Sequence, residues 1–159
     1  MRAAGFKRAV WTLAATLLLG VAHAADVHVM DAWSRATPPG TDVAVGYVSI
    51  HNMGRSPLKL SGASSPRAQR VEMHETRIDD KGMSTMRPLK DVVVAPGTAL
   101  TFAAGGRHLM LVGLKSPLVA GEKVPLTLRF DGEPPVEVLL DVRPIGAAGP
   151  AEDHAHHAH

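Results

Sequence analysis

Short apolar runs alternate with turn-forming residues along most of the chain. Several runs, such as residues 43–52, alternate apolar and polar side chains, which is the pattern of a strand with one buried face. No long apolar repeat of 3.6 residues follows the first 24 residues, so we expect little helix. The predicted strands cover residues 27–33, 43–52, 58–61, 68–78, 83–89, 92–95, 98–103, 108–114, 124–130 and 136–142.

Turn signals separate these strands. Asp79-Asp80-Lys81-Gly82 predicts a tight hairpin, and Asp131-Gly132-Glu133-Pro134 predicts a second one. Gly82 favours a bulge, which we expect to set His74 opposite Met86. Short strands joined by such turns are typical of an all-β, antiparallel sandwich or barrel, here as a single domain.

The first 24 residues have the pattern of a secretory signal. Basic residues precede an apolar stretch, and Ala22-His23-Ala24 supplies the small side chains at a cleavage site. We therefore expect a signal peptide over 1–24, a folded domain over 25–145 and a flexible tail over 146–159. After cleavage the protein would be periplasmic with no membrane span; an uncleaved membrane anchor is the alternative.

Composition and charge exclude several classes of function. Loss of the signal would remove three basic residues and no acidic one, so the formal net charge would fall from +2 to −1, which argues against nucleic-acid binding. The chain has no cysteine, which excludes a thiol nucleophile, a CxxC redox pair and a blue-copper thiolate. It also has no GxSxG or HExxH motif, so we expect no enzyme.

Histidine and methionine carry the remaining chemistry. His108 and Met110 lie two residues apart on a predicted strand, so their side chains share one face. His74 and Met86 lie on the two arms of the predicted hairpin. Two imidazoles and two thioethers form a soft, neutral donor set that favours Cu(I) over Zn(II), Ca(II) or Mg(II).

The same His-x-Met pattern occurs at two further places, His28-Val29-Met30 and His51-Asn52-Met53. A buried methionine often only fills a gap in a core, and a single histidine is often an ordinary surface residue. The pattern by itself therefore does not identify the metal-binding residues.

Three segments together resemble the PCuAC-type periplasmic copper chaperones. The segments are VEMHE at 71–75, MSTMRPL at 83–89 and GGRHLML at 105–111. Their spacing matches the family motif of His, eleven residues, Met, 21 residues and His-x-Met. AWSRATPPG at 32–40 and GYV at 46–48 also resemble the family, so the resemblance spans about residues 26–131.

The resemblance implies a cupredoxin-like β-sandwich that binds one Cu(I) through His74, Met86, His108 and Met110. It also implies delivery of copper to the CuA centre of cytochrome c oxidase. The expected partner is then a copper-accepting oxidase subunit or another assembly chaperone, and the carrier is expected to be a monomer. At the position of Glu75 the family often has methionine. This difference affects only an auxiliary sulfur contact and none of the four expected ligands.

The C-terminal tail adds a second metal-binding sequence with four histidines, His154, His156, His157 and His159. An imidazole-rich, unstructured segment suits Cu(II), Ni(II) or Zn(II) more than Cu(I), and we expect it to bind Cu(II). An inert tail or a purification tag is the alternative. The tail also favours a competing function, that of a general copper buffer without a dedicated oxidase target.

Overall fold

The structure is a computed structural model that describes residues 26–147, and every regular element among them is a strand. None of the described segments is a helix that is long and apolar enough to cross a membrane. The signal peptide predicted at 1–24 and all four tail histidines lie outside the described residues. The ten strands are β1 (Val27–Arg35), β2 (Val43–Asn52), β3 (Leu58–Ser64), β4 (Ala68–Ile78), β5 (Ser84–Leu89), β6 (Val92–Val94), β7 (Ala99–Phe102), β8 (Arg107–Leu114), β9 (Lys123–Phe130) and β10 (Val136–Arg143).

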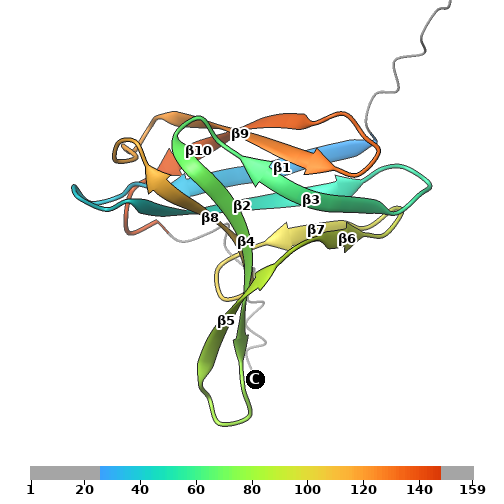
Figure 1. The fold of residues 1–159 in the computed structure, drawn as a ribbon, viewed down its shortest axis with the longest axis horizontal. Helices are drawn as coiled ribbons and strands as arrows, with labels where there is room; N and C mark the ends of the chain where they lie inside the picture. Colours follow the sequence, from blue (N-terminus) through green and yellow to red (C-terminus); the bar gives the residue numbers. More distant parts are fainter. Residues whose placement is uncertain (1–25, 148–159) are drawn as a thin grey trace, which may run out of the picture.

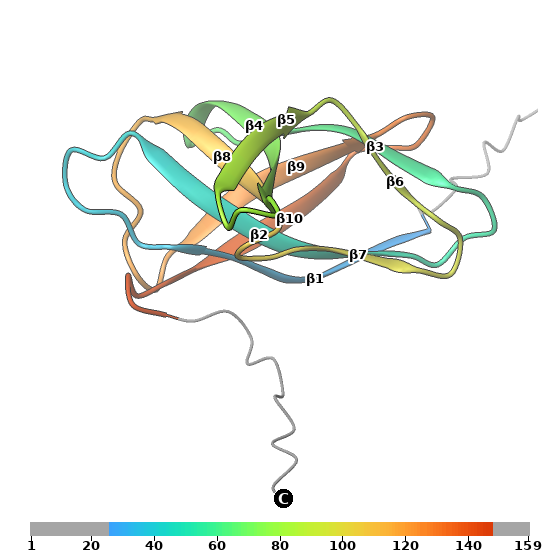
Figure 2. The same cartoon turned by 90° about the horizontal axis from the view of Figure 1, so that it is seen from below.

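Seven of these strands close into a barrel (Figures 1 and 2). They are paired in the order β4, β8, β2, β1, β10, β9 and β3, and β3 returns to β4 through the pair Ala63 and Val71. The predicted all-β single domain is confirmed. One pair departs from the predicted antiparallel arrangement: β1 and β10 run parallel, because the strands of a closed ring of seven cannot all alternate in direction.

The barrel interior is filled by the apolar residues that alternate along the strands. Ile50, Leu60, Leu111, Leu128 and Leu140 are fully buried. Their neighbours along each strand face outward, as the period of two requires. The strand pattern in the sequence therefore decides which side chains reach the outer surface.

The β4–β5 hairpin projects from the barrel (Figure 1). The N–H of Asp79 donates to the carbonyl of Met83 over 2.9 Å, and Gly82 has a φ of 77° between them. The hydrogen bond between Asp79 and Met83 closes the loop. As a result, the β5 residue opposite each β4 residue lies two positions later in the sequence than predicted. His74 lies opposite Pro88, so the expectation that it opposes Met86 is wrong.

A buried carboxylate ties this hairpin to the barrel. Glu75 accepts hydrogen bonds from Arg87 over 2.7 Å and from Arg77 over 2.8 Å, and its other oxygen lies 3.4 Å from Arg107 on β8. The guanidinium of Arg87, followed by that of Arg77, lowers the pKa of the Glu75 carboxyl below its usual value. Charge-assisted bonds of this kind are stronger than neutral ones, and here they join three strands.

Replacing Glu75 with glutamine is expected to loosen the hairpin while the barrel stays intact. Amide hydrogen exchange across residues 76–87 should rise about 10-fold or more, because local opening becomes easier. Since the pKa of Glu75 is lowered in the folded state, its stabilisation is present above the unfolded pKa and is lost as pH falls through the lower, folded value. The wild-type hairpin should therefore loosen in acid, whereas the variant should respond less.

The matched control is Glu137→Gln, which changes an exposed glutamate on β10. Hydrogen exchange followed by NMR at several pH values makes the comparison. Equal hairpin exchange rates in wild type and Glu75→Gln would show that the arginine contacts do not hold the hairpin.

Candidate metal centre

Three of the four expected ligands meet on the outer face of β4 and β8. His74 lies directly opposite His108, and their ring centroids are 5.9 Å apart. Met110 follows two residues along β8 and so shares this face. Met73, which precedes His74, and Leu109, which lies between His108 and Met110, are buried in the core. Burial of the core side chains therefore turns the donors outward together.

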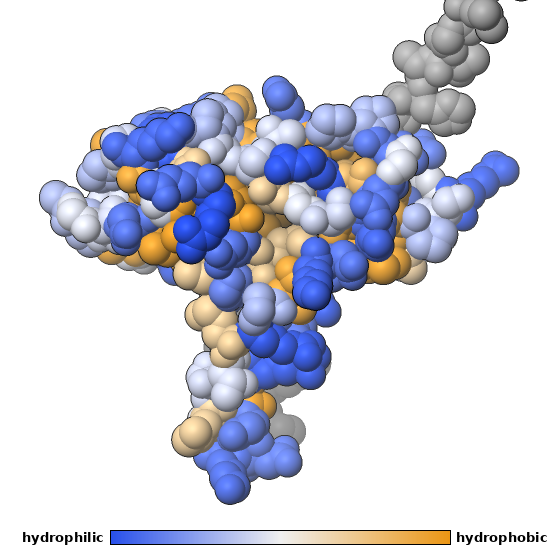
Figure 3. Space-filling view, viewed as in Figure 1, coloured by the Kyte–Doolittle hydropathy of each residue, from blue (hydrophilic) through white to orange (hydrophobic). Residues whose placement is uncertain are grey.

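Met86 stands apart from the other three donors. It lies on β5 opposite Thr76, and 56% of its surface is exposed. The hairpin that carries it projects from the rest of the molecular surface (Figure 3). Met110 lies opposite Glu72 on β4, whereas Met86 lies opposite Thr76. The two methionines are therefore four residues apart along the direction of β4. At about 3.3 Å per residue this is roughly 13 Å. Both thioethers could bind one ion only if the hairpin lay closer to the barrel.

The loop before β8 fixes the orientation of His108. Its Nδ1 lies 3.2 Å from the carbonyl oxygen of Gly106, and a carbonyl can only accept, so Nδ1 carries the proton and donates. The same carbonyl accepts the N–H of Thr76 over 3.0 Å. Nε2 of His108 is then the nitrogen with a free lone pair, as in a metal-binding histidine whose other nitrogen is held by the backbone.

A carboxylate holds His74 in a similar way. Nε2 of His74 lies 3.0 Å from Glu72, whose other oxygen accepts from Arg70 over 2.6 Å. Arg70 and then His74 lower the pKa of Glu72, so this carboxylate is ionised and can only accept. Nδ1 of His74 is buried and has no hydrogen-bond partner among the described residues. An unpaired buried nitrogen is costly, and a metal ion bound there would satisfy it.

The geometry suits one soft cation. Imidazole nitrogens bind metals at about 2 Å, so two rings that share one ion have centroids roughly 6 Å apart. The observed 5.9 Å agrees with this arrangement. Within residues 26–147 no three histidine, aspartate or glutamate side chains converge as a metal site. The donor atoms that this face offers to an ion are the two imidazoles and the Met110 thioether. Such donors suit Cu(I).

Two positioning groups of this centre were not anticipated from the sequence. Glu72 precedes His74 by two residues on the same strand, so its place on the same face could have been inferred from the strand period. The role of the Gly106 carbonyl depends on how the loop is folded, and no pattern of side chains indicates it. The tail histidines lie outside the described residues.

Comparison with known proteins places the chain in a family. The model described as "Putative lipoprotein LpqE-like" matches residues 27–142. A curated relative, "Putative lipoprotein Lxx21020" of Leifsonia xyli subsp. xyli, is 37% identical over 123 residues, which cover 77% of this chain and 72% of the relative.

Solved structures share the fold. The copper-bound PCuAC domain from PmoF2 has a TM-score of 0.63 and 23% identity, over 75% of this chain and 93% of that one. The Cu(I) form of DR1885 from Deinococcus radiodurans has a TM-score of 0.55 and 34% identity, over 70% of this chain and 74% of that one. The chain therefore belongs to the LpqE-like family and has the fold of the PCuAC domains.

Proposed function

We propose that this protein is a non-catalytic carrier of Cu(I), bound by His74, Met86, His108 and Met110. The observation that supports this most directly is the cross-strand histidine pair at 5.9 Å with Met110 on the same face. The buried, unpaired Nδ1 of His74 adds a position where an ion is favoured. The names of two structural neighbours, which mention bound copper, point to the same cargo.

The unequal exposure of the ligands suggests how copper is loaded and released. Three donors lie in the barrel wall, whereas Met86 lies on the exposed hairpin. Cu(I) would bind the wall donors first, and the hairpin would then bend to add Met86. On release, a ligand of the acceptor would replace Met86 while the wall donors still hold the ion. Copper would thus pass by ligand exchange within a transient complex.

We further propose that the carrier is exported, acts as a monomer in the periplasm and delivers copper to the CuA centre of cytochrome c oxidase. The predicted signal sequence and the lipoprotein name of the family support a location in the cell envelope. A general copper buffer is the second candidate, because the histidine-rich tail offers additional ligands without a dedicated target.

A Cu(I) competition titration under reducing conditions tests the binding site. The wild-type chain should bind one equivalent tightly. Met110→Ala should weaken it by more than the 10- to 100-fold that loss of an outer-shell partner typically costs. Met86→Ala should weaken it less, because this ligand is exposed. Met83→Ala, an exposed methionine on the same hairpin, is the control and should bind as wild type. Tight binding that survives Met110→Ala would contradict the site.

Replacing Glu72 tests its role as the positioning residue of His74. Glu72→Ala should weaken Cu(I) binding by about 10- to 100-fold, since the imidazole loses the acceptor that fixes its tautomer. The 15N shifts of His74 should show a mixture of tautomers in the variant and one tautomer in wild type. Arg70→Ala, which leaves the Glu72–His74 bond in place, should change both readouts less. Unchanged shifts and affinity would show that Glu72 does not orient His74.

Transfer to an acceptor separates a chaperone from a buffer. The Cu(I)-loaded chain is mixed with a copper-free CuA domain, and the copper content of both is measured after their separation. A chaperone should transfer its Cu(I) faster than a small-molecule copper complex of equal affinity. A rate no faster than that complex would favour the buffer.

A further inference from the structure

The two other His-x-Met segments lie side by side in the structure. They occupy β1 and β2, which pair antiparallel, and His28 lies directly opposite His51. The ladder continues past the end of β2, because the N–H of Met53 donates to the carbonyl of Asp26 over 2.7 Å. Two segments that are 23 residues apart in sequence therefore form one four-residue group.

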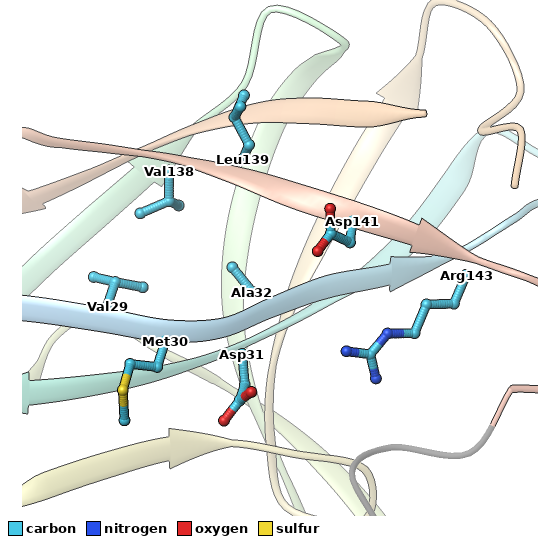
Figure 4. Close-up of a pocket in the computed structure, with 8 residues that line it drawn as sticks. All are labelled: Val29, Met30, Asp31, Ala32, Val138, Leu139, Asp141 and Arg143. Carbon is cyan, nitrogen blue, oxygen red and sulfur yellow. The ribbon is translucent and has the colours of Figure 1, made fainter. Parts of the chain in front are cut away.

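All four side chains of this group belong to the outer face of the sheet. The residue between the first pair, Val29, packs against the core, and Asn52 in the second pair is 1% exposed. Their neighbours must point outward. Figure 4 shows Met30 on the opposite side of β1 from Val29. Met30 and Met53 are 39% and 69% exposed, so both thioethers are accessible to an ion from solvent.

The register places the four donor residues at neighbouring positions on the two strands. Side chains directly opposite in an antiparallel pair have Cβ atoms about 4.5–5.5 Å apart, and diagonal neighbours are about 7–8 Å apart. His28 and His51 occupy the first kind of position. Met30 is diagonal to His51, and Met53 is diagonal to His28. The arrangement repeats the cross-strand histidine pair of the β4–β8 centre, with a methionine two residues further along the strand.

Among the described residues, the imidazoles of this group make no hydrogen bond. Within residues 26–147 the hydrogen bonds of histidine rings involve His74 and His108 alone. One exposed carboxylate, that of Asp31, lies on the same side of β1 as Met30 (Figure 4). Asp31 is at the bulge in β1 and has a φ of 49°.

We propose that His28 and His51, together with Met30 or Met53, bind a second Cu(I) ion on the outer face of β1 and β2. Two imidazoles and a thioether are neutral, soft ligands that suit this ion. This site lacks the carboxylate and the carbonyl that hold the two rings of the β4–β8 centre. Its affinity is therefore about 10- to 100-fold lower. The inference does not depend on the proposed role of the β4–β8 centre.

The test uses the full chain labelled with 13C at the methionine methyl groups and titrated with Cu(I) under reducing conditions. NMR then reports each methionine separately, whatever the tail histidines bind. The Met110 signal should shift with the first equivalent. The Met30 signal, the Met53 signal or both should shift with a later equivalent, at an affinity about 10- to 100-fold lower. Met83 should not respond.

The double variant His28→Gln and His51→Gln should abolish the shifts of Met30 and Met53. The unchanged response of Met110 in that variant would show that the fold is intact. Absence of any Met30 or Met53 shift in wild type would overturn the inference, as would shifts that survive the double variant or that appear with Zn(II) or Cu(II) but not with Cu(I). Shifts of Met30 or Met53 without a shift of Met110 would support this site and contradict the β4–β8 centre.

Discussion

The pairing of β4 with β8 fixes the position of nearly every group in the proposed copper centre. His74 can oppose His108 only while Met73 and Leu109 are buried on the inner face of the same strands. A slip of one residue would turn the imidazoles inward and the apolar side chains outward. The cost of exposing Leu109 therefore holds the two histidines together, although neither histidine is part of the apolar core.

Two glutamates lie on opposite faces of β4 and have different roles. Glu72 lies on the outer face and orients His74. Glu75 lies on the other face and joins the hairpin to β8 through arginines. Between them, the Gly106 carbonyl accepts both a hairpin amide and the His108 ring. The proposed bending of the hairpin would therefore act on the orientation of a proposed ligand through this shared carbonyl.

The sequence predicted the strands well because burial on one face forces a period of two, which residues 43–52 display clearly. It did not predict the register of the β4–β5 hairpin, because that register depends on which backbone groups of Asp79 and Met83 close the loop. The parallel pairing of β1 with β10 follows from closure of the barrel, which has no local signature. The face shared by His108 and Met110 was predictable from their spacing, whereas the distance of Met86 from them was not.

Pro88 has a consequence for how any partner can approach. It lies on β5, which ends the order of strands and so offers a free edge beside the proposed copper ligands. Such an edge usually invites another chain to add a strand, which leads to aggregation or to tight, unselective pairing. Proline has no N–H to donate and interrupts that ladder. Recognition of a partner at this edge would then depend more on side chains than on backbone pairing, which favours brief encounters over lasting ones.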